Sequence, residues 1–385
     1  MDRECALNQT HQLPSWCEID LSALRSNIMQ LASRLSPGCR LGAVVKADAY
    51  GHGLVPCARA ALDAGADLLI VNDLSEACVL RDEGLTAQIY VCGPVLRSQA
   101  ALAVTCGVSL VVHDAGLVES LAQAAVARGR QVPLHLKVET GTHRQGIAID
   151  DVVEFARQVS NRDGVQLEGL TTHFADLEDS QDRLFARQQL ACLQDARQRL
   201  IEAGYDVPST HAASSAAALL LPEAQLDMVR AGLAIYGLWP SAAMAMELSG
   251  HLELSPVLSW RARVFPGVAV EAGQSVGYGR TYHVGAGPAR RQAVLNVGYH
   301  EGFDRRRSNT GHVLVAGQRA PIRGRICMNM SMVEPPSEVG PGTVATLIGR
   351  DGEQEISADH FAAWTASINY EIISRIHPRI PRIYV

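Results

Sequence analysis

Short runs of apolar and β-branched residues recur along the first two-thirds of the chain, and segments with helical spacing lie between them. The eight runs are Leu41–Val45, Leu68–Val71, Ile89–Cys92, Ser109–Val112, Leu134–Val138, Leu167–Thr172, Pro208–His211 and Leu226–Val229. Helical spacing is found in Pro56–Ala64, Leu117–Arg128, Val152–Ser160 and Arg183–Ala203. Eight strand–helix units over about 230 residues are typical of a (β/α)8 TIM barrel. We therefore predict an α/β fold with this barrel over residues 15–245.

The pattern changes near residue 240. Val- and Gly-rich runs separated by Gly and Pro turns follow, as in Leu258–Val264 and Thr343–Ile348. These predict a C-terminal, mainly β domain over residues 246–385, with a last helix in Ser357–Ala363 or Ile368–Arg375. We expect residues 1–14 to be flexible or packed on the β domain.

Composition excludes several classes of protein. Charged residues make up 19% of the chain and hydrophobic residues 47%, so extensive disorder is not expected. The net charge is −6 and there is no basic run, which argues against nucleic acid as the partner. No apolar run is long enough for a membrane span, and nine scattered cysteines without a metal-binding spacing suggest reduced thiols and no metal site. We expect a soluble, cytoplasmic protein with a small substrate.

Lysine is almost absent from this chain. Of 34 basic residues only Lys46 and Lys137 are lysines, and the rest are arginines. A codon bias explains the depletion but not the two survivors. Arginine stays charged, whereas a desolvated lysine can lose its proton and attack a carbonyl group to form a Schiff base. The surviving lysines therefore suggest amine chemistry.

The polar loops after the first, seventh and eighth predicted strands contain candidate functional residues. In a TIM barrel the active site forms at the carboxyl ends of the strands, and the loops after strands seven and eight often bind phosphate. Lys46 directly follows the first strand. Ser214 and Ser215 follow the seventh, where they can bind an anion or serve as an ordinary helix N-cap. Arg230 and Gly232 follow the eighth and complete a candidate phosphate site.

A Schiff-base lysine facing a phosphate site describes a site for pyridoxal 5′-phosphate (PLP), which makes the Cα proton of an amino acid removable. The sequence resembles the alanine racemases, PLP-dependent enzymes of fold type III, over nearly its whole length. The resemblance rests on the segments AVVKADAYGHG, KVETG, VRAGLAIYG, VGYGRTY, GRICMNM and INYEI. It implies an isomerase, a PLP-dependent amino-acid racemase whose first expected substrate is alanine.

The resemblance also implies roles for residues around the cofactor. Lys46 would bind PLP covalently and act as one of two acid/base groups. Arg230 would face the pyridine nitrogen, and a permanently charged donor there leaves the nitrogen unprotonated, which favours reprotonation at Cα over transamination. His173, after the sixth strand, would stack near the cofactor, although a lone histidine is more often a core residue. The phosphate would be held by Tyr50, Ser215, Gly232, Leu233 and Tyr370.

Lys137 lies on the same face of its predicted strand as His135 and Glu139. An inward-pointing lysine needs a partner or a neutral amine. In relatives the equivalent lysine can be carbamylated, and the resulting anion positions an arginine, here Arg144, which would contact the PLP phenolic oxygen and the substrate carboxylate. An ion pair of Lys137 with Glu139 or another carboxylate is the alternative.

Racemisation needs a second base on the opposite face of the substrate. By the resemblance this base is Tyr278, in VGYGRTY, which would serve the L-isomer while Lys46 serves the D-isomer. In the family this tyrosine comes from the partner subunit, and Tyr299 and Met328 shape the substrate entrance. The resemblance therefore implies a head-to-tail homodimer with shared active sites.

The chain departs from the common family pattern around the substrate and phosphate. The departures are Thr142, His143, Ser214, His300, Glu301 and Asn329. They leave serine or a larger amino acid open as the substrate. A retro-aldol or decarboxylating relative is a further alternative, but such reactions need no base on the second face, so Tyr278 argues against it. A non-catalytic PLP carrier is disfavoured because such proteins lack the β domain.

Overall fold

The computed structural model describes residues 9–178, 182–340 and 342–385, and the chain forms two compact units. The first, here called the barrel unit, consists of Leu24–Ala49 and Leu54–Ser255. The second, the β unit, consists of the described residues among those up to Ala23, in the short segment Tyr50–Gly53, and in Pro256–Val385. The domain limits of 15–245 and 246–385 and the expectation for residues 1–14 stay predictions, and residues 1–8 lie outside the described part of the chain.

Eight parallel strands form the sheet of the barrel unit, as predicted. In spatial order the sheet runs β8-β7-β6-β5-β4-β3-β2-β9. The strands are β2 (Arg40–Val44), β3 (Leu68–Val71), β4 (Ile89–Val91), β5 (Ser109–Val112), β6 (Val132–Lys137), β7 (Val165–Thr171), β8 (Ser209–His211) and β9 (Met228–Ala231). The two ends of the sheet meet through backbone hydrogen bonds from Asp227 N to Thr210 O (3.1 Å) and from Arg230 N to Ala213 O (2.9 Å), which close the barrel.

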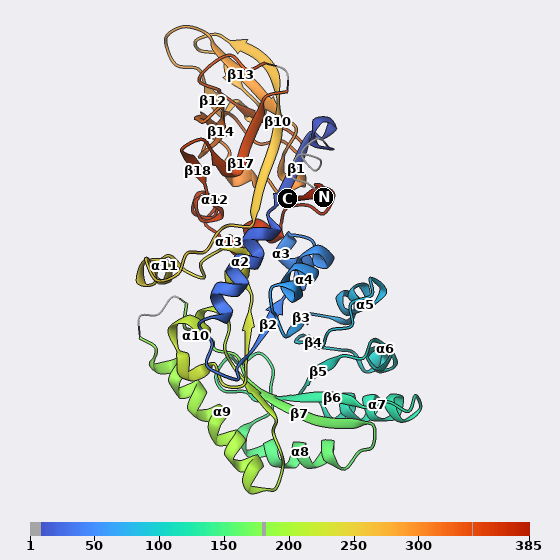
Figure 1. Ribbon diagram of the computed structural model, residues 1–385. Helices are drawn as coiled ribbons and strands as arrows, with labels where there is room; N and C mark the ends of the chain where they lie inside the picture. The colour runs from blue at the N-terminus through green and yellow to red at the C-terminus, as the bar shows by residue number, and fades with distance from the viewer. Residues whose placement is uncertain (1–8, 179–181, 341) are drawn as a thin grey trace. The chain divides into compact units, whose positions relative to one another are not determined.

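Helices alternate with these strands along the chain, and α5 to α9 lie outside the sheet (Figure 1). They are α2 (Leu21–Ala32), α4 (Leu54–Asp63), α5 (Leu74–Asp82), α6 (Ala100–Cys106), α7 (Ala115–Val126), α8 (Val152–Ser160), α9 (Leu184–Glu202), α10 (Ser215–Leu220) and α11 (Ala242–Glu247). Asp73 and Asp114 cap α5 and α7 by accepting hydrogen bonds from backbone N–H groups of the first turn. Strands such as β3 are buried along their whole length, which is typical of a parallel sheet covered by helices.

The β unit is built around one long strand. β10 (Leu258–Val270) pairs antiparallel with β1 (Ser15–Ile19), β13 (Arg290–Leu295) and β17 (Val344–Asp351). The other strands are β11 (Ser275–Val276), β12 (Tyr282–His283), β14 (His312–Val315), β15 (Gln318–Pro321), β16 (Ser331–Val333), β18 (Gln354–Ile356) and β19 (Arg382–Tyr384). Two helices close the unit, α12 (Ala358–Thr365) and α13 (Asn369–Ser374), so both segments considered for the last helix are helical.

The core of the β unit contains a cluster of aromatic rings. Trp260 and Phe303 meet edge to face at 5.9 Å between ring centroids, and Phe303 and Phe361 do so at 5.8 Å. The guanidinium of Arg307, fully buried, lies over the rings of Phe303, Phe361 and Trp364. This cluster fixes η8 (Arg305–Arg307) against α12.

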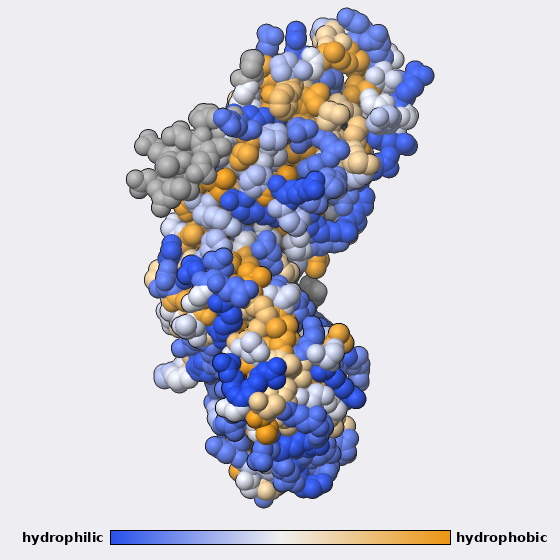
Figure 2. Space-filling view, turned by 90° about the vertical axis from the view of Figure 1, so that its right-hand side faces the viewer, coloured by the Kyte–Doolittle hydropathy of each residue, from blue (hydrophilic) through white to orange (hydrophobic). Residues whose placement is uncertain are grey.

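The outer surface carries apolar residues as small areas among hydrophilic ones on the face shown in Figure 2. Among the helices of the described residues, none combines the length and hydrophobicity that crossing a bilayer requires.

Candidate active site

Lys46 follows the first barrel strand and opens a turn of unusual handedness. α3 (Lys46–Gly51) contains Ala47, Asp48, Ala49 and Tyr50, whose φ angles lie between 53° and 55°. A left-handed turn of four non-glycine residues costs roughly 1–2 kcal/mol per residue. Hydrogen bonds within the barrel unit hold part of it, because Asp48 Oδ1 accepts from Leu54 N at 2.7 Å and Glu76 Oε1 accepts from Ala47 N. The turn thus fixes Lys46 at the carboxyl end of β2.

The loops after β8 and β9 are joined by Ser215. Its buried Oγ accepts hydrogen bonds from Gly232 N at 2.9 Å and Ala234 N at 3.4 Å. Because the oxygen is occupied as an acceptor, its O–H remains available to donate to an anion. Tyr236, at the end of η5 (Leu233–Tyr236), donates to Val44 O at 2.9 Å and ties this loop to the strand that precedes Lys46. The predicted residues Ser215, Gly232 and Leu233 are therefore together.

Arg230 is held by a set of acceptors around its guanidinium. Nη1 donates to His211 Nδ1 at 2.6 Å and Thr171 Oγ1 at 3.3 Å. Nη2 donates to the backbone oxygens of Ala212 and Thr172 and to His173 Nδ1, at 2.8, 2.9 and 3.1 Å. Among the described residues, only Nε of this guanidinium has no partner. The predicted residues Arg230 and His173 are thus in direct contact, and one N–H of Arg230 is left for a ligand.

Positive charges converge on His173. Burial lowers the pKa of His173 well below its usual value, and the charges of Arg230, Lys137, Arg144 and Lys46 lower it further, in that order. His173 is therefore neutral, and its Nδ1 can accept from Arg230. The same electrostatic coupling indicates that the four predicted cationic residues surround one region of the barrel unit, with the loop of Arg144 tied to that of His173 by the bond from Thr142 Oγ1 to His173 O (2.6 Å).

Lys137 lies at the end of β6 and is 8% exposed. Burial lowers its pKa to about 7, with further contributions from Arg230 and Arg144. Within the described residues its amine makes no ion pair or hydrogen bond. The carboxylate of Glu139 accepts instead from the backbone N–H groups of Gly141 (2.6 Å) and Arg144 (3.4 Å). A buried amine that is partly neutral near pH 7 and faces two arginines is suited to becoming an anion.

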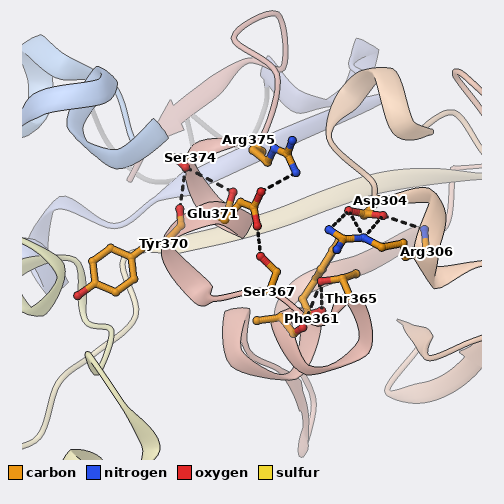
Figure 3. Close-up of polar contacts among 10 residues, drawn as sticks. Asp304, Arg306, Phe361, Thr365, Ser367, Tyr370, Glu371, Ser374 and Arg375 are labelled. Atoms are coloured by element: carbon orange, nitrogen blue, oxygen red, sulfur yellow. Dashed lines mark hydrogen bonds and ion pairs between the residues drawn. The ribbon is translucent and has the colours of Figure 1, made fainter. Parts of the chain in front are cut away.

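Tyr50 and Tyr370 pack together within the β unit, with ring centroids 6.2 Å apart. Figure 3 shows the Tyr370 ring pointing away from the polar cluster on its own helix, where Glu371 pairs with Arg375 at 2.7 Å. The Tyr370 backbone oxygen accepts from Ser374 Oγ at 2.7 Å. Two of the predicted phosphate residues, far apart in sequence, are therefore neighbours.

Tyr278, Tyr299 and Met328 project from the β unit with exposures of 74%, 43% and 56%. The loops of Tyr299 and Met328 are joined by bonds from Tyr299 N to Cys327 O (3.1 Å) and from His300 N to Met328 O (2.9 Å). A side-chain bond between Asn329 and Glu301 reinforces them. Large exposed side chains on tied loops are suited to contact another molecule.

Sequence reasoning missed the polar residues inside the barrel that support Arg230, chiefly His211, His135 and Glu168. The alternation of β6 had placed His135 on the face of Lys137, which was the only signal. Nothing in the sequence indicated the left-handed turn after Lys46.

The residues of the barrel unit fit PLP on three observations. Lys46 supplies an amine at the carboxyl end of β2, Arg230 Nε–H supplies a free donor for the ring nitrogen, and the Ser215 hydroxyl can donate to a phosphate. The fold and these groups define the class of the protein as a PLP-binding enzyme built on a TIM barrel with a β domain.

Comparisons with known proteins give the family. Residues 19–240 match the family described as alanine racemase, N-terminal domain, and residues 257–384 match alanine racemase, C-terminal domain. The chain is 41% identical over 375 residues to the alanine racemase of Symbiobacterium thermophilum (96% of this chain, 97% of the relative) and 36% identical to that of Methanococcus maripaludis (97% and 99%). The chain belongs to the alanine racemase family.

Solved structures agree with this assignment. The alanine racemase of Bacillus anthracis with bound L-Ala-P superimposes with a TM-score of 0.91 at 35% identity, covering 97% of this chain and 95% of that one. The histidine racemase of Leuconostoc mesenteroides subsp. sake does so with a TM-score of 0.88 at 28% identity, covering 97% and 98%. The predicted fold class, the isomerase class and the PLP cofactor are confirmed.

Proposed function

We propose that this racemase interconverts L- and D-alanine by a two-base mechanism with Lys46 and Tyr278. The observation that carries the proposal is the Arg230 guanidinium, whose Nη atoms are occupied by protein acceptors while Nε–H remains free. Bound PLP withdraws electrons from the Cα–H bond of the amino acid and makes that proton acidic. A permanently charged donor such as Arg230 would leave the ring nitrogen unprotonated. This favours return of the proton to Cα, which a racemase requires.

The chain's own residues divide the remaining work. Lys46 holds the cofactor and exchanges the proton of the D-isomer at Nζ, and the Tyr278 hydroxyl exchanges that of the L-isomer. Ser215, Gly232, Leu233, Tyr50 and Tyr370 hold the phosphate. Arg144 orients the substrate carboxylate, and Tyr299 and Met328 limit access. The exposure of Tyr278 supports its supply to the active site by the partner subunit of a head-to-tail homodimer.

We further propose that Lys137 is carbamylated. Its amine is buried, its pKa is lowered to about 7, and the nearby arginines favour an anion. A carbamate would then fix the Arg144 guanidinium for the substrate. We also infer that the protein works in the cytoplasm, which agrees with the free thiols of the described cysteines.

Isotope exchange tests the proposed function. Purified, PLP-loaded protein is incubated in D2O with L-alanine, L-serine or L-histidine, and deuterium at Cα and optical rotation are followed. Deuterium uptake with inversion, fastest for alanine, is expected. Faster inversion of serine or histidine would change the proposed substrate. Cleaved products would support a lyase, and absence of exchange with all three would refute racemase activity.

A further inference from the structure

A chain of hydrogen bonds continues from Arg230 into the interior of the barrel. Beyond the contact of Arg230 Nη1 with His211 Nδ1, His211 Nε2 lies 2.9 Å from His135 Nδ1. His135 Nε2 in turn lies 2.8 Å from Glu168 Oε2. The three residues beyond Arg230 come from β8, β6 and β7, and both histidines are at most 3% exposed. None of them has a role in the proposed reaction.

The donor and acceptor at every step of this chain follow from its first member. A guanidinium can only donate, so His211 Nδ1 must be unprotonated. Burial, followed by the charge of Arg230, lowers the pKa of His211 well below its usual value, so the ring is neutral and its proton lies on Nε2. That proton is donated to His135 Nδ1, which leaves the His135 proton on Nε2. The last partner in this series of hydrogen bonds must therefore accept a proton from His135 Nε2, and the Glu168 carboxylate is such an acceptor.

The other neighbours of Glu168 also donate hydrogen bonds to its carboxylate. Ser109 Oγ donates to Oε2 at 2.7 Å, and Gln88 Nε2 donates to Oε1 at 3.2 Å. Gln88 is oriented by Arg40, which donates to its Oε1 at 2.6 Å. Burial raises the pKa of Glu168, but the hydrogen bonds that it accepts from His135 and Ser109, together with the charge of Arg40, hold the pKa below its usual value. The carboxylate is thus the final acceptor of two series of hydrogen bonds. One begins at Arg230 and the other begins at Arg40.

The rings of His135 and His211 are closely packed. The Tyr90 ring lies 4.8 Å from the His135 ring and 5.4 Å from the His211 ring, between centroids. A Cβ at Gly169 would lie 2.3 Å from His135 Nδ1, so the glycine permits the histidine to sit there. The rings can therefore change tautomer but have little freedom to turn.

We propose that Glu168 is a positioning residue for Arg230, acting through His135 and His211 by fixing the tautomers that keep His211 Nδ1 an acceptor. This inference rests on the proposed function for its effect on catalysis. It assigns a role to a carboxylate that touches neither cofactor nor substrate. Its consequence is that Arg230 keeps Nη1 occupied and Nε directed to its ligand.

Glu168→Gln separates this role from simple packing because it keeps the shape and removes the charge. If the new amide nitrogen faces Gln88, two donors oppose each other, since Arg40 fixes Gln88. If it faces His135, His135 Nε2 must accept, so the proton of His135 moves to Nδ1. His211 Nε2 must then accept in turn, and its proton moves to Nδ1. The protonated His211 Nδ1 then faces the N–H of Arg230, and two donors oppose each other. Ser109→Ala is the matched control, because it removes a bond to the same carboxylate and leaves the carboxylate as acceptor.

Nitrogen NMR of 15N-histidine-labelled protein tests the tautomers, with and without PLP. His135→Gln and His211→Gln assign the two signals. We expect Nδ1 of both rings to be unprotonated in the wild type and in Ser109→Ala, and protonated or mixed in Glu168→Gln. Protonated His211 Nδ1 in the wild type, or unchanged tautomers in Glu168→Gln, would overturn the proposal. If Glu168→Gln does not fold, the protonation of His211 Nδ1 in the wild type still tests the proposal.

The catalytic consequence is measured separately. Glu168→Gln should lower kcat roughly tenfold, because a buried bond to a charged group is disturbed, with KM changed less than about twofold and the absorption band of bound PLP shifted. The loss should vanish in an Arg230→Gln background. A loss that persists there would overturn the route through Arg230. Absent racemisation in the wild type would refute the proposed function but leave the tautomer result standing.

Discussion

Asn329 Nδ2 donates to Glu301 Oε1 at 2.7 Å, while the other oxygen of this carboxylate accepts from Gly298 N at 2.8 Å. The first bond joins the loop of Met328 to the loop of Tyr299, and the second holds the Glu301 carboxylate within its own loop. Both Glu301 and Asn329 are positions at which the chain departs from the common family pattern. The two departures are therefore in direct contact, with the amide of Asn329 as the donor and the carboxylate of Glu301 as the acceptor.

Asn329→Asp should loosen the proposed substrate entrance. Two carboxylates would face each other where a bond now exists, and losing one bond of this kind corresponds to an increase in KM of roughly fivefold with little change in kcat. Steady-state kinetics with L-alanine measures this. The double variant Glu301→Gln with Asn329→Asp restores a donor and an acceptor and should recover KM. A double variant as poor as the single one would argue against the pairing.

Lys46 should be the residue that binds the cofactor. The chain has only two lysines, so reduction of the PLP-loaded protein with borohydride followed by peptide mapping gives an unambiguous answer. We expect the label on the peptide that contains Lys46 and none on the peptide that contains Lys137. A label on Lys137 would contradict the assignment of both lysines.

Tyr278→Phe should separate the two proton transfers. Racemisation should fall in both directions by roughly 10²–10⁴-fold, because removal of a general base has this effect and the equilibrium constant of a racemase is one. Cα exchange of D-alanine in D2O should persist, since Lys46 serves that isomer, while exchange of L-alanine is lost. The absorption of bound PLP should stay unchanged. Loss of PLP from the variant would indicate a structural role for Tyr278 instead.

Lys137 should make the stability of the protein depend on pH. Its pKa is lowered from 10.5 to about 7, so between these values the unfolded chain binds more protons than the folded one. The free energy of unfolding therefore rises with pH across this window, by up to about 1.4 kcal/mol per pH unit from this group. Urea unfolding in carbonate-free buffer at pH 7 and pH 9 measures it.

Lys137→Met is the control for that measurement. It removes the titrating amine, so the difference in unfolding free energy between wild type and variant should grow in favour of the wild type from pH 7 to pH 9. Parallel curves would show that Lys137 does not titrate in this window. Intact mass of the wild type in bicarbonate, compared with the variant, then shows whether one carbon dioxide is added.

The barrel could be predicted from the sequence because its signal is local. Each strand is a short buried run next to a helix, and the bounds differ from prediction by only a few residues. The predicted strand Leu226–Val229 is observed as Met228–Ala231, because Leu226 has a φ of 49°, which a strand does not tolerate. The shift brings Arg230 into β9, where its side chain reaches the strand-end carbonyl groups.

The hydrogen-bonded residues that lie behind Arg230 could not be predicted in the same way. His211, His135 and Glu168 contact one another through the register of three strands, and a shift in the β6–β7 pairing occurs between Leu134 and His135. Register of this kind depends on the closed barrel and not on any short segment. The Schiff-base role of Lys46 was predicted from the two surviving lysines and from its place after the first barrel strand, whereas the role of Arg230 at the ring nitrogen came from the motif resemblance.

Gly169→Ala should damage the barrel interior by displacing His135. An added Cβ would lie 2.3 Å from His135 Nδ1 and 2.5 Å from Ser209 O, and neither neighbour can move freely in the packed barrel. Overpacking of this kind costs about 1–3 kcal/mol of unfolding free energy. Gly285→Ala is the matched control, because no atom lies within 4 Å of its added Cβ. Thermal unfolding should show a lower midpoint for Gly169→Ala only, together with reduced kcat, since His135 can no longer align His211 with Arg230. Equal midpoints for the two variants would show that the interior tolerates the methyl group, and that Gly169 is not needed to seat the histidine.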